Sequence, residues 1–257
     1  MSEFCELFTK TQLASSIKTI NDVLFHANEI VKSVQTSCDI DPICEITVKV
    51  NTSGIPFKSK QKGEPKHVIS GSKAVTTFLE LLREGQKKAL TDGVKGCGPF
   101  LKLADHFKPG DVDIFFLDSK EVSRVKYGNV DVVHLMTKNI TEHLDNFDLS
   151  CCKTSMNIEE SKFWVSLHCL YTMLTGNCFI PKYLESIEKF KDVYVKTNGT
   201  PYSPNQHLNG KHKVMYERIQ LRIEKYKERG YTFQYFETNK VLSCIGSNHM
   251  NNYLVGY

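Results

Sequence analysis

Two aspartates separated by a single residue, Asp111 and Asp113, precede an apolar run at residues 114–117. If this segment is a strand, the alternation of side chains places both carboxylates on one face. Two like charges side by side repel unless a cation offsets them. Because Mg²⁺ binds one or two carboxylates together with phosphate oxygens, the pair predicts a metal site for phosphate chemistry. A solvated turn after Pro109-Gly110 is the alternative interpretation.

A Gly-Ser turn, Gly71-Ser72, follows a short predicted strand that begins at His67 and precedes a helical pattern. Glycine lets the backbone approach a ligand closely. The Ser72 hydroxyl and the free amides of the helix N-terminus can hold phosphate oxygens, helped by the helix dipole. The alternative is an ordinary helix start with Ser72 as the N-cap. Lys73 follows directly, where its charge would either help to bind a triphosphate or block it.

A third carboxylate, Asp148, lies in a segment at 147–154 that the sequence predicts to be a strand. An unpaired charge there is costly to bury, so Asp148 needs a partner. A metal shared with Asp111 and Asp113 explains all three acids at once, whereas exposure to water or pairing with a lysine is the alternative. Two metal ions bridged by three carboxylates can activate an attacking oxygen and stabilise a leaving pyrophosphate.

Apolar periodicity predicts the elements that must position these groups. The sequence predicts helices over 11–36, 158–175, 181–192 and 211–229, strands over 43–50, 130–137 and 231–236, and loops over 51–66 and 91–99. Trp164 is expected in the core. No internal repeat, low-complexity block or clear linker interrupts the pattern.

The predicted helix at 211–229 is rich in lysine and arginine, and Arg222, Lys225 and Arg229 are spaced to share one face. That face could contact a triphosphate or a polynucleotide backbone. The alternative is a solvated face whose cations pair with glutamates of the same helix, which are Glu217, Glu224 and Glu228.

Composition narrows the class of protein. The chain has 257 residues, 40% of them hydrophobic and 24% charged, which is typical of a globular protein. A net charge of +4 fits anionic ligands and is too small to indicate a dedicated nucleic-acid binder. The nine cysteines include no Cys-x-x-Cys pair, which favours free thiols in a reducing compartment over a zinc ribbon or a disulfide framework. No secretory signal or membrane-length apolar run is visible, so we expect an intracellular protein, cytoplasmic or nuclear.

The order Gly71-Ser72, Asp111-Val112-Asp113 and Asp148 resembles the polymerase-β-like nucleotidyltransferase superfamily, whose motif is a Gly-Ser turn, then Asp-x-Asp, then a third acid on an adjacent strand. Segments at 109–115, 147–153 and 222–231 are similar to an uncharacterised group of such proteins in large DNA viruses and some eukaryotes. The resemblance covers roughly residues 67–233. The interval from Gly71 to Asp111 is long for the superfamily, and Lys73 stands where many active members have a small residue.

This resemblance implies an α/β (α+β) nucleotidyltransferase fold, with a mixed sheet in a catalytic region at 1–157 and a helical region at 158–257 that closes the nucleotide cleft. Asp111, Asp113 and Asp148 would bind Mg²⁺ or Mn²⁺, and Gly71, Ser72 and Lys73 would bind the nucleotide. The implied reaction moves a nucleoside monophosphate from a nucleoside triphosphate to a hydroxyl of a protein, an RNA or a small molecule, and releases pyrophosphate.

Two other functions stay open. A catalytically degenerate member of the superfamily would act as a binding or scaffold module. A glycosyltransferase that uses Asp-x-Asp to hold a nucleotide sugar would leave Gly71-Ser72 and Asp148 unexplained.

Overall fold

The structure, a computed structural model, describes residues 2–36, 40–48, 66–92, 111–157, 159–180 and 210–234. Within these ranges the helices are α1 (Ser2–Ser16), α2 (Ile20–Phe25), α3 (Ala27–Thr36), α4 (Ser72–Thr91), α5 (Ile140–Asp145), α6 (Leu167–Thr175) and α9 (Gly210–Lys227), with a short 3₁₀ helix, η1 (Ser150–Cys152). The strands are β1 (Ile43–Thr47), β2 (His67–Ser70), β3 (Val112–Phe116), β4 (Ser123–Tyr127), β5 (Val130–His134), β6 (Thr154–Asn157), β7 (Lys162–Ser166), β8 (Asn177–Phe179) and β9 (Thr232–Gln234).

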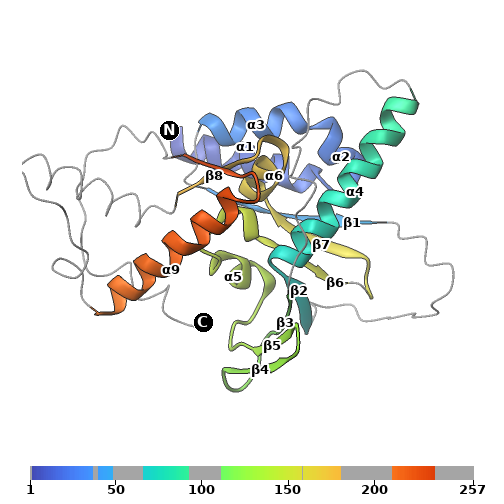
Figure 1. The fold of residues 1–257 in the computed structure, drawn as a ribbon. Coiled ribbons are helices and arrows are strands. Elements are labelled where there is room, and N and C mark those ends of the chain that lie inside the picture. The colour runs from blue at the N-terminus through green and yellow to red at the C-terminus, as the bar shows by residue number, and fades with distance from the viewer. Residues whose placement is uncertain are drawn as a thin grey trace, which may run out of the picture.

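Seven of the described strands form one mixed sheet in the order β1-β7-β6-β2-β3-β5-β4. Neighbouring strands are antiparallel except for β3 and β5, which are parallel. β8 and β9 form a separate parallel pair. The expected mixed-sheet α/β architecture is therefore confirmed (Figure 1).

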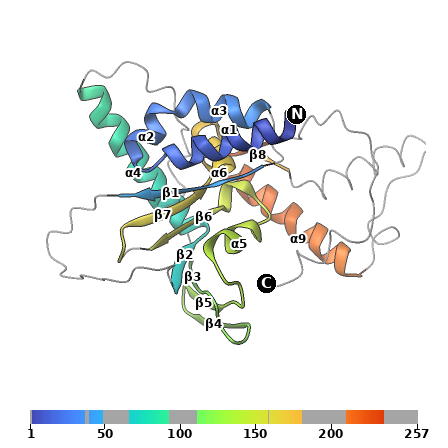
Figure 2. The same ribbon diagram turned by 180° about the vertical axis from the view of Figure 1, so that it is seen from behind.

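One face of the sheet packs against a helical layer. Ile46, Phe163, Met156 and Ile69 occupy matched positions on neighbouring strands, so their side chains share this face. Phe78 of α4 packs on Phe163 with ring centroids 5.1 Å apart. Both views show α1, α2, α3 and α6 grouped beside β1 (Figures 1 and 2). The main apolar core lies between this layer and the sheet.

The opposite face carries the polar residues of interest and is covered in part by α5. Ser70, Asp113 and Asp131 are matched across β2, β3 and β5, so all three point to this side. His143 of α5 contacts this face by a hydrogen bond to Ser70 and by ring contact with Phe115, whose centroid lies 4.6 Å away. Ser70, Asp113 and Asp131 therefore lie on the face opposite the one on which Phe78 of α4 packs.

The prediction of a strand at 147–154 is wrong in its first part. Phe147, Asp148 and Leu149 form a bend, η1 follows, and the strand begins only at Thr154. The Cys152 amide donates to the Leu149 carbonyl at 3.0 Å and so closes a turn. Most side chains of this segment are buried, whichever way they point, so a run of apolar residues appears without a strand.

The prediction of a helix at 158–175 is also wrong in its first part. β7 occupies Lys162–Ser166 between β1 and β6, and α6 begins only at Leu167. Phe163, Trp164 and Val165 are aromatic or β-branched and buried, as expected of a central strand. The Ser166 hydroxyl accepts from the Cys169 amide at 3.0 Å, which caps the start of α6. Trp164 is in the core, as expected.

Other predictions agree or lie outside the described residues. The helix predicted at 11–36 is three shorter helices, and that predicted at 211–229 corresponds to α9. The predicted helix at 181–192 and most of the loops at 51–66 and 91–99 lie outside the described residues. The proposed boundary after residue 157 separates β6 from β7, which pair in one sheet. That division stays a prediction.

Two further findings concern the described residues. None of their helices is long and apolar enough to cross a membrane. Five cysteines are buried free thiols, namely Cys44, Cys151, Cys152, Cys169 and Cys178.

Candidate functional site

Asp113 lies at the centre of the candidate site. Its matched neighbours are Ser70 on the antiparallel strand β2 and Asp131 on the parallel strand β5. Asp111 comes directly before β3, two residues from Asp113 and so on the same side of the strand. The fold thus brings three carboxylates to one edge of the polar face, and only two of them belong to the Asp-x-Asp motif.

Gly71 lies against the Asp113 carboxylate. It is the N-cap residue of α4, with φ +71° and ψ −142°, a conformation that side chains rarely adopt. A Cβ built at this position would lie 3.8 Å from Asp113 Oδ2 and 3.8 Å from Phe147 Cε1. The N-terminus of a 20-residue helix therefore begins beside the acids. Its free amide groups can hold an anion there.

Ser72 and Lys73 lie in the first turn of α4. The alternative in which Ser72 caps the helix is wrong, because Gly71 is the N-cap and provides no side-chain hydrogen bond. Both side chains are half-buried. They follow directly after Gly71, which is close to Asp113, and their role in nucleotide binding stays a prediction.

The electrostatics of Asp113 are dominated by burial and by other acids. Burial, then the charge of Asp111, then the charge of Asp131 raise the pKa of Asp113 above its ordinary value. Arg124 and Arg222 oppose this shift. The ionised form is therefore disfavoured in the protein alone, and a cation placed among these carboxylates would restore it.

Asp131 is the residue that sequence reasoning missed. It is only 1% exposed, and Arg124 Nη2 donates to its Oδ2 at 2.8 Å, with Lys126 Nζ at 3.9 Å from the same oxygen. The hydrogen bond from Arg124 keeps the pKa of Asp131 below its ordinary value. The other oxygen, Oδ1, is buried and has no hydrogen-bond partner in the described part of the chain. A lone acid in the β-branched segment Val130-Asp131-Val132-Val133 was the available signal.

Asp148 does not lie on a strand next to β3. It lies in the bend before η1, where Arg222 Nη1 of α9 donates to its Oδ2 at 2.7 Å. Its Oδ1 is buried and, among the described residues, has no hydrogen-bond partner. Phe147 lies beside Gly71, so the Asp148–Arg222 pair is adjacent to the acid site. This pairing resembles the alternative of a partnered acid, with an arginine in place of the lysine.

A buried polar cluster supports the site from within the protein. The Ser70 hydroxyl is 2.9 Å from His143 Nε2 and 2.6 Å from the Ser155 hydroxyl. Burial lowers the pKa of His143 to about 4, so the imidazole is neutral near pH 7. The rings of Phe115 and Phe147 pack against it. This cluster fixes the end of β2 immediately before Gly71.

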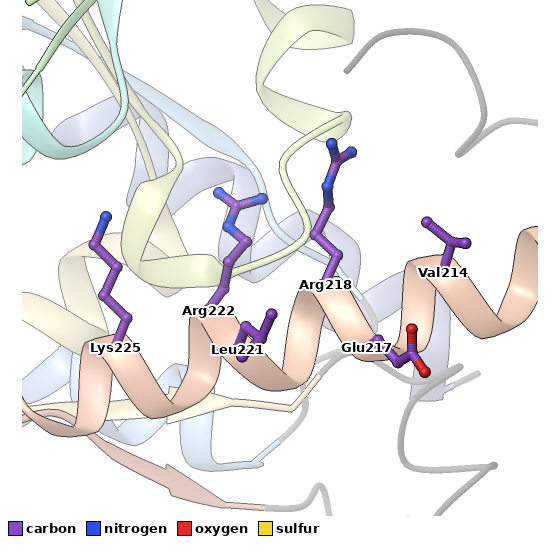
Figure 3. A pocket seen from close by; sticks show the side chains of 6 residues that line it. All are labelled: Val214, Glu217, Arg218, Leu221, Arg222 and Lys225. Atoms are coloured by element: carbon purple, nitrogen blue, oxygen red, sulfur yellow. The ribbon is translucent and has the colours of Figure 1, made fainter.

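α9 contributes an open pocket of about 430 Å³ beside the site, lined by Val214, Glu217, Arg218, Leu221, Arg222 and Lys225. In Figure 3, Arg218, Arg222 and Lys225 extend to the same side of the helix, towards the yellow-green segments that contain α5. The basic face therefore differs from the predicted one in one member, because Arg218 takes the place of Arg229. Arg229 lies beyond the end of α9, and its guanidinium stacks on the Tyr226 ring at 4.7 Å.

The alternative, in which cations of this helix pair with its own glutamates, is observed for two lysines outside the predicted basic face. Lys213 pairs with Glu217 at 3.8 Å and Lys227 with Glu224 at 2.9 Å. Arg222 pairs instead with Asp148, in the bend before η1. The Cys152 thiol donates to Tyr226 Oη at 2.9 Å, which further attaches α9 to η1.

The acidic side chains of the site could bind a divalent cation only together with oxygens from a bound ligand. Among the described residues, no three histidine, cysteine or acidic side chains are arranged to hold a metal ion by themselves. Asp111 and Asp113 supply two carboxylates, and Mg²⁺ commonly binds one or two together with substrate phosphates and water. Comparisons of the chain with family models, characterised proteins and solved structures found no match.

Proposed function

We propose that this chain is a metal-dependent nucleotidyltransferase that moves a nucleoside monophosphate from a nucleoside triphosphate to a hydroxyl acceptor and releases pyrophosphate. The observation that carries the proposal is the position of Gly71, the N-cap residue of α4, where an added Cβ would lie 3.8 Å from Asp113 Oδ2. It joins an anion-binding helix N-terminus to a pair of cation-binding acids. A metal–triphosphate complex has both of the charges that these two features would bind.

Each group has a distinct role in this proposal. Asp111 and Asp113 hold Mg²⁺ or Mn²⁺, which would neutralise phosphate charge and polarise the reacting phosphoryl group. Gly71 leaves room for the phosphates, and the amides of Ser72 and Lys73 bind their oxygens. For the third acid of the site, the pairing of the strands favours Asp131, because it is matched to Asp113 on the parallel strand β5. Asp148 instead holds Arg222 close to the site.

One observation favours a second candidate, a degenerate module that binds a ligand without turnover. Arg124 holds Asp131 and Arg222 holds Asp148, so both candidates for a third carboxylate are already neutralised by arginine. A site limited to Asp111 and Asp113 could bind a nucleotide without activating an acceptor.

A thermal-shift titration of the four nucleoside triphosphates, with and without Mg²⁺ or Mn²⁺, tests the proposal. Ligand at about 100 times its Kd should stabilise the fold by about 2.7 kcal/mol. We expect a metal-dependent shift for at least one triphosphate in the wild type and none in Asp111→Asn/Asp113→Asn. No shift with any triphosphate would contradict nucleotide binding. A shift without pyrophosphate release, for every class of acceptor tried, would favour the binding module.

A further inference from the structure

We infer that Arg124 determines which form of the cation the site accepts: by offsetting the charge of Asp131, it favours a cation bound to a triphosphate over a free cation. This inference rests on the proposed function, because it concerns the selectivity of the same metal site. Arg124 is then a positioning residue, which acts on the site through Asp131 and does not touch the reacting atoms.

Arg124 lies on β4, the last strand of the sheet, next to β5 (Figure 1). One matched row of residues crosses β2, β3, β5 and β4, and it consists of Ser70, Asp113, Asp131 and Lys126. Arg124 is two residues from Lys126 on the same strand, so both side chains extend from the face of the sheet that carries the acids. Strand pairing thus connects Asp113 to these cations through Asp131.

The ion pair between Arg124 and Asp131 has one buried member. Arg124 Nη2 donates to Asp131 Oδ2 at 2.8 Å, and the side chain of Asp131 is 2% exposed whereas that of Arg124 is 51% exposed. Replacing a buried ion pair by apolar side chains of similar volume is often neutral or stabilising. Stability alone therefore does not explain an aspartate between Val130 and Val132. We attribute the pair to its effect on the neighbouring acids.

Both charges of the pair act on Asp113. Burial, Asp111 and Asp131 raise the pKa of Asp113, and the charge of Arg124 lowers it. Without Arg124, three uncompensated carboxylates would lie together and attract a free divalent cation strongly. A triphosphate keeps a net negative charge after it has bound one divalent cation, so the same carboxylates would repel that complex. With Arg124 present, one of the three charges is offset, and Asp111 and Asp113 remain to bind the cation.

The test measures two dissociation constants for each protein at about pH 8. Electron paramagnetic resonance gives that of free Mn²⁺, and calorimetry gives that of the Mn²⁺ complex of a non-hydrolysable triphosphate analogue, with each of the four bases. The variants are Arg124→Gln and Arg124→Gln/Asp131→Asn, which removes both charges of the pair. The matched control is Lys162→Gln on β7, which removes a cation that lies 2.9 Å from Glu45 in the same sheet. Urea unfolding shows whether each variant is folded.

We expect Arg124→Gln to bind free Mn²⁺ about tenfold more tightly than the wild type does, and the Mn²⁺–triphosphate complex about tenfold more weakly. A general loss of structure cannot change the two constants in opposite directions. The double variant has the net charge of the wild type in this part of the site, so both of its constants should return towards the wild-type values. The control should match the wild type in both constants.

Three results would overturn the inference alone, provided that the wild type binds the complex. They are unchanged constants in Arg124→Gln, the same changes in Lys162→Gln, and a loss of both kinds of binding that the double variant does not restore. A wild type that binds the Mn²⁺ complex of none of the four analogues would contradict the proposed function and this inference together.

Discussion

Asp113 and Asp131 occupy matched positions on the parallel strands β3 and β5, and the charge of Asp131 raises the pKa of Asp113. Asp131 is neutralised by Arg124, whereas Asp113 faces Asp111 and the N-terminus of α4. The two acids therefore differ in their partners although the sheet makes them equivalent. Asp113 is the one that needs an added cation.

The unfavourable surroundings of Asp113 predict a stabilising substitution. Because its folded-state pKa is raised above the unfolded value, the fold is most favoured at low pH and loses stability as pH rises through the folded pKa. Asp113→Asn removes this loss, so its urea unfolding midpoint in metal-free buffer at neutral pH should exceed that of the wild type. Glu121→Gln, at an exposed site in the bend between β3 and β4, is the control and should not raise the midpoint. A lower midpoint for Asp113→Asn would contradict the claim that ionised Asp113 destabilises the metal-free fold.

Gly71→Ala should destabilise the protein chiefly through its backbone. The added methyl group would meet only ordinary contacts at 3.8 Å, but φ +71° with ψ −142° is unfavourable for alanine. We expect a loss of about 1–3 kcal/mol in unfolding free energy, measured in urea. Gly128→Ala is the comparison, since Gly128 also has positive φ, +61°, with open space around it. A smaller loss at Gly71 than at Gly128 would show that the conformation beside Asp113 is not demanding.

The Asp148–Arg222 ion pair should contribute to the attachment of α9. A double-mutant cycle with Asp148→Asn and Arg222→Gln should give a coupling energy of about 1–2 kcal/mol, because both side chains are largely buried. The same cycle at Glu224 and Lys227, an exposed pair 2.9 Å apart, should give about 0.3–0.5 kcal/mol. Equal values for the two pairs would contradict a special role for the contact with Asp148.

The buried His143 predicts a dependence of stability on pH. Its folded-state pKa, about 4, lies below the ordinary histidine value of 6.5, so protonation favours the unfolded chain. The contribution of neutral His143 to the free energy of unfolding is fully present above the unfolded-state pKa. It is lost as the pH falls towards the folded-state pKa. Between pH 7 and about pH 5 the wild type should lose about 2 kcal/mol more than His143→Gln in urea unfolding. Parallel losses in the two proteins would show that His143 titrates normally.

Local signals in the sequence predicted part of this account. The alternation around Asp111 and Asp113 correctly predicted β3, and the Gly-Ser turn correctly predicted the start of α4. β3 and the start of α4 depend on residues that are neighbours in the chain, so a local sequence pattern is enough to predict them. The mixed sheet was expected from the family resemblance rather than from local patterns, and the structure confirms it.

Other features depend on distant contacts and could not be read in this way. Asp131 is opposite Asp113 only because β5 pairs with β3 in one register, and no local pattern fixes that register. Residues 147–152 are buried against α6 and α9, so their apolar run is not the signature of a strand. β7 was missed because its short apolar run continues directly into the helix α6.

Mn²⁺ binding measured by electron paramagnetic resonance tests the central claim most directly. Free Mn²⁺ is titrated with wild type, Asp113→Asn and the control Glu121→Gln, each with and without a nucleoside triphosphate. The account predicts that the triphosphate strengthens Mn²⁺ binding to the wild type and to Glu121→Gln beyond binding by the nucleotide alone. It predicts no such gain for Asp113→Asn. Equal Mn²⁺ binding by all three proteins would contradict a metal–nucleotide site at Asp111 and Asp113.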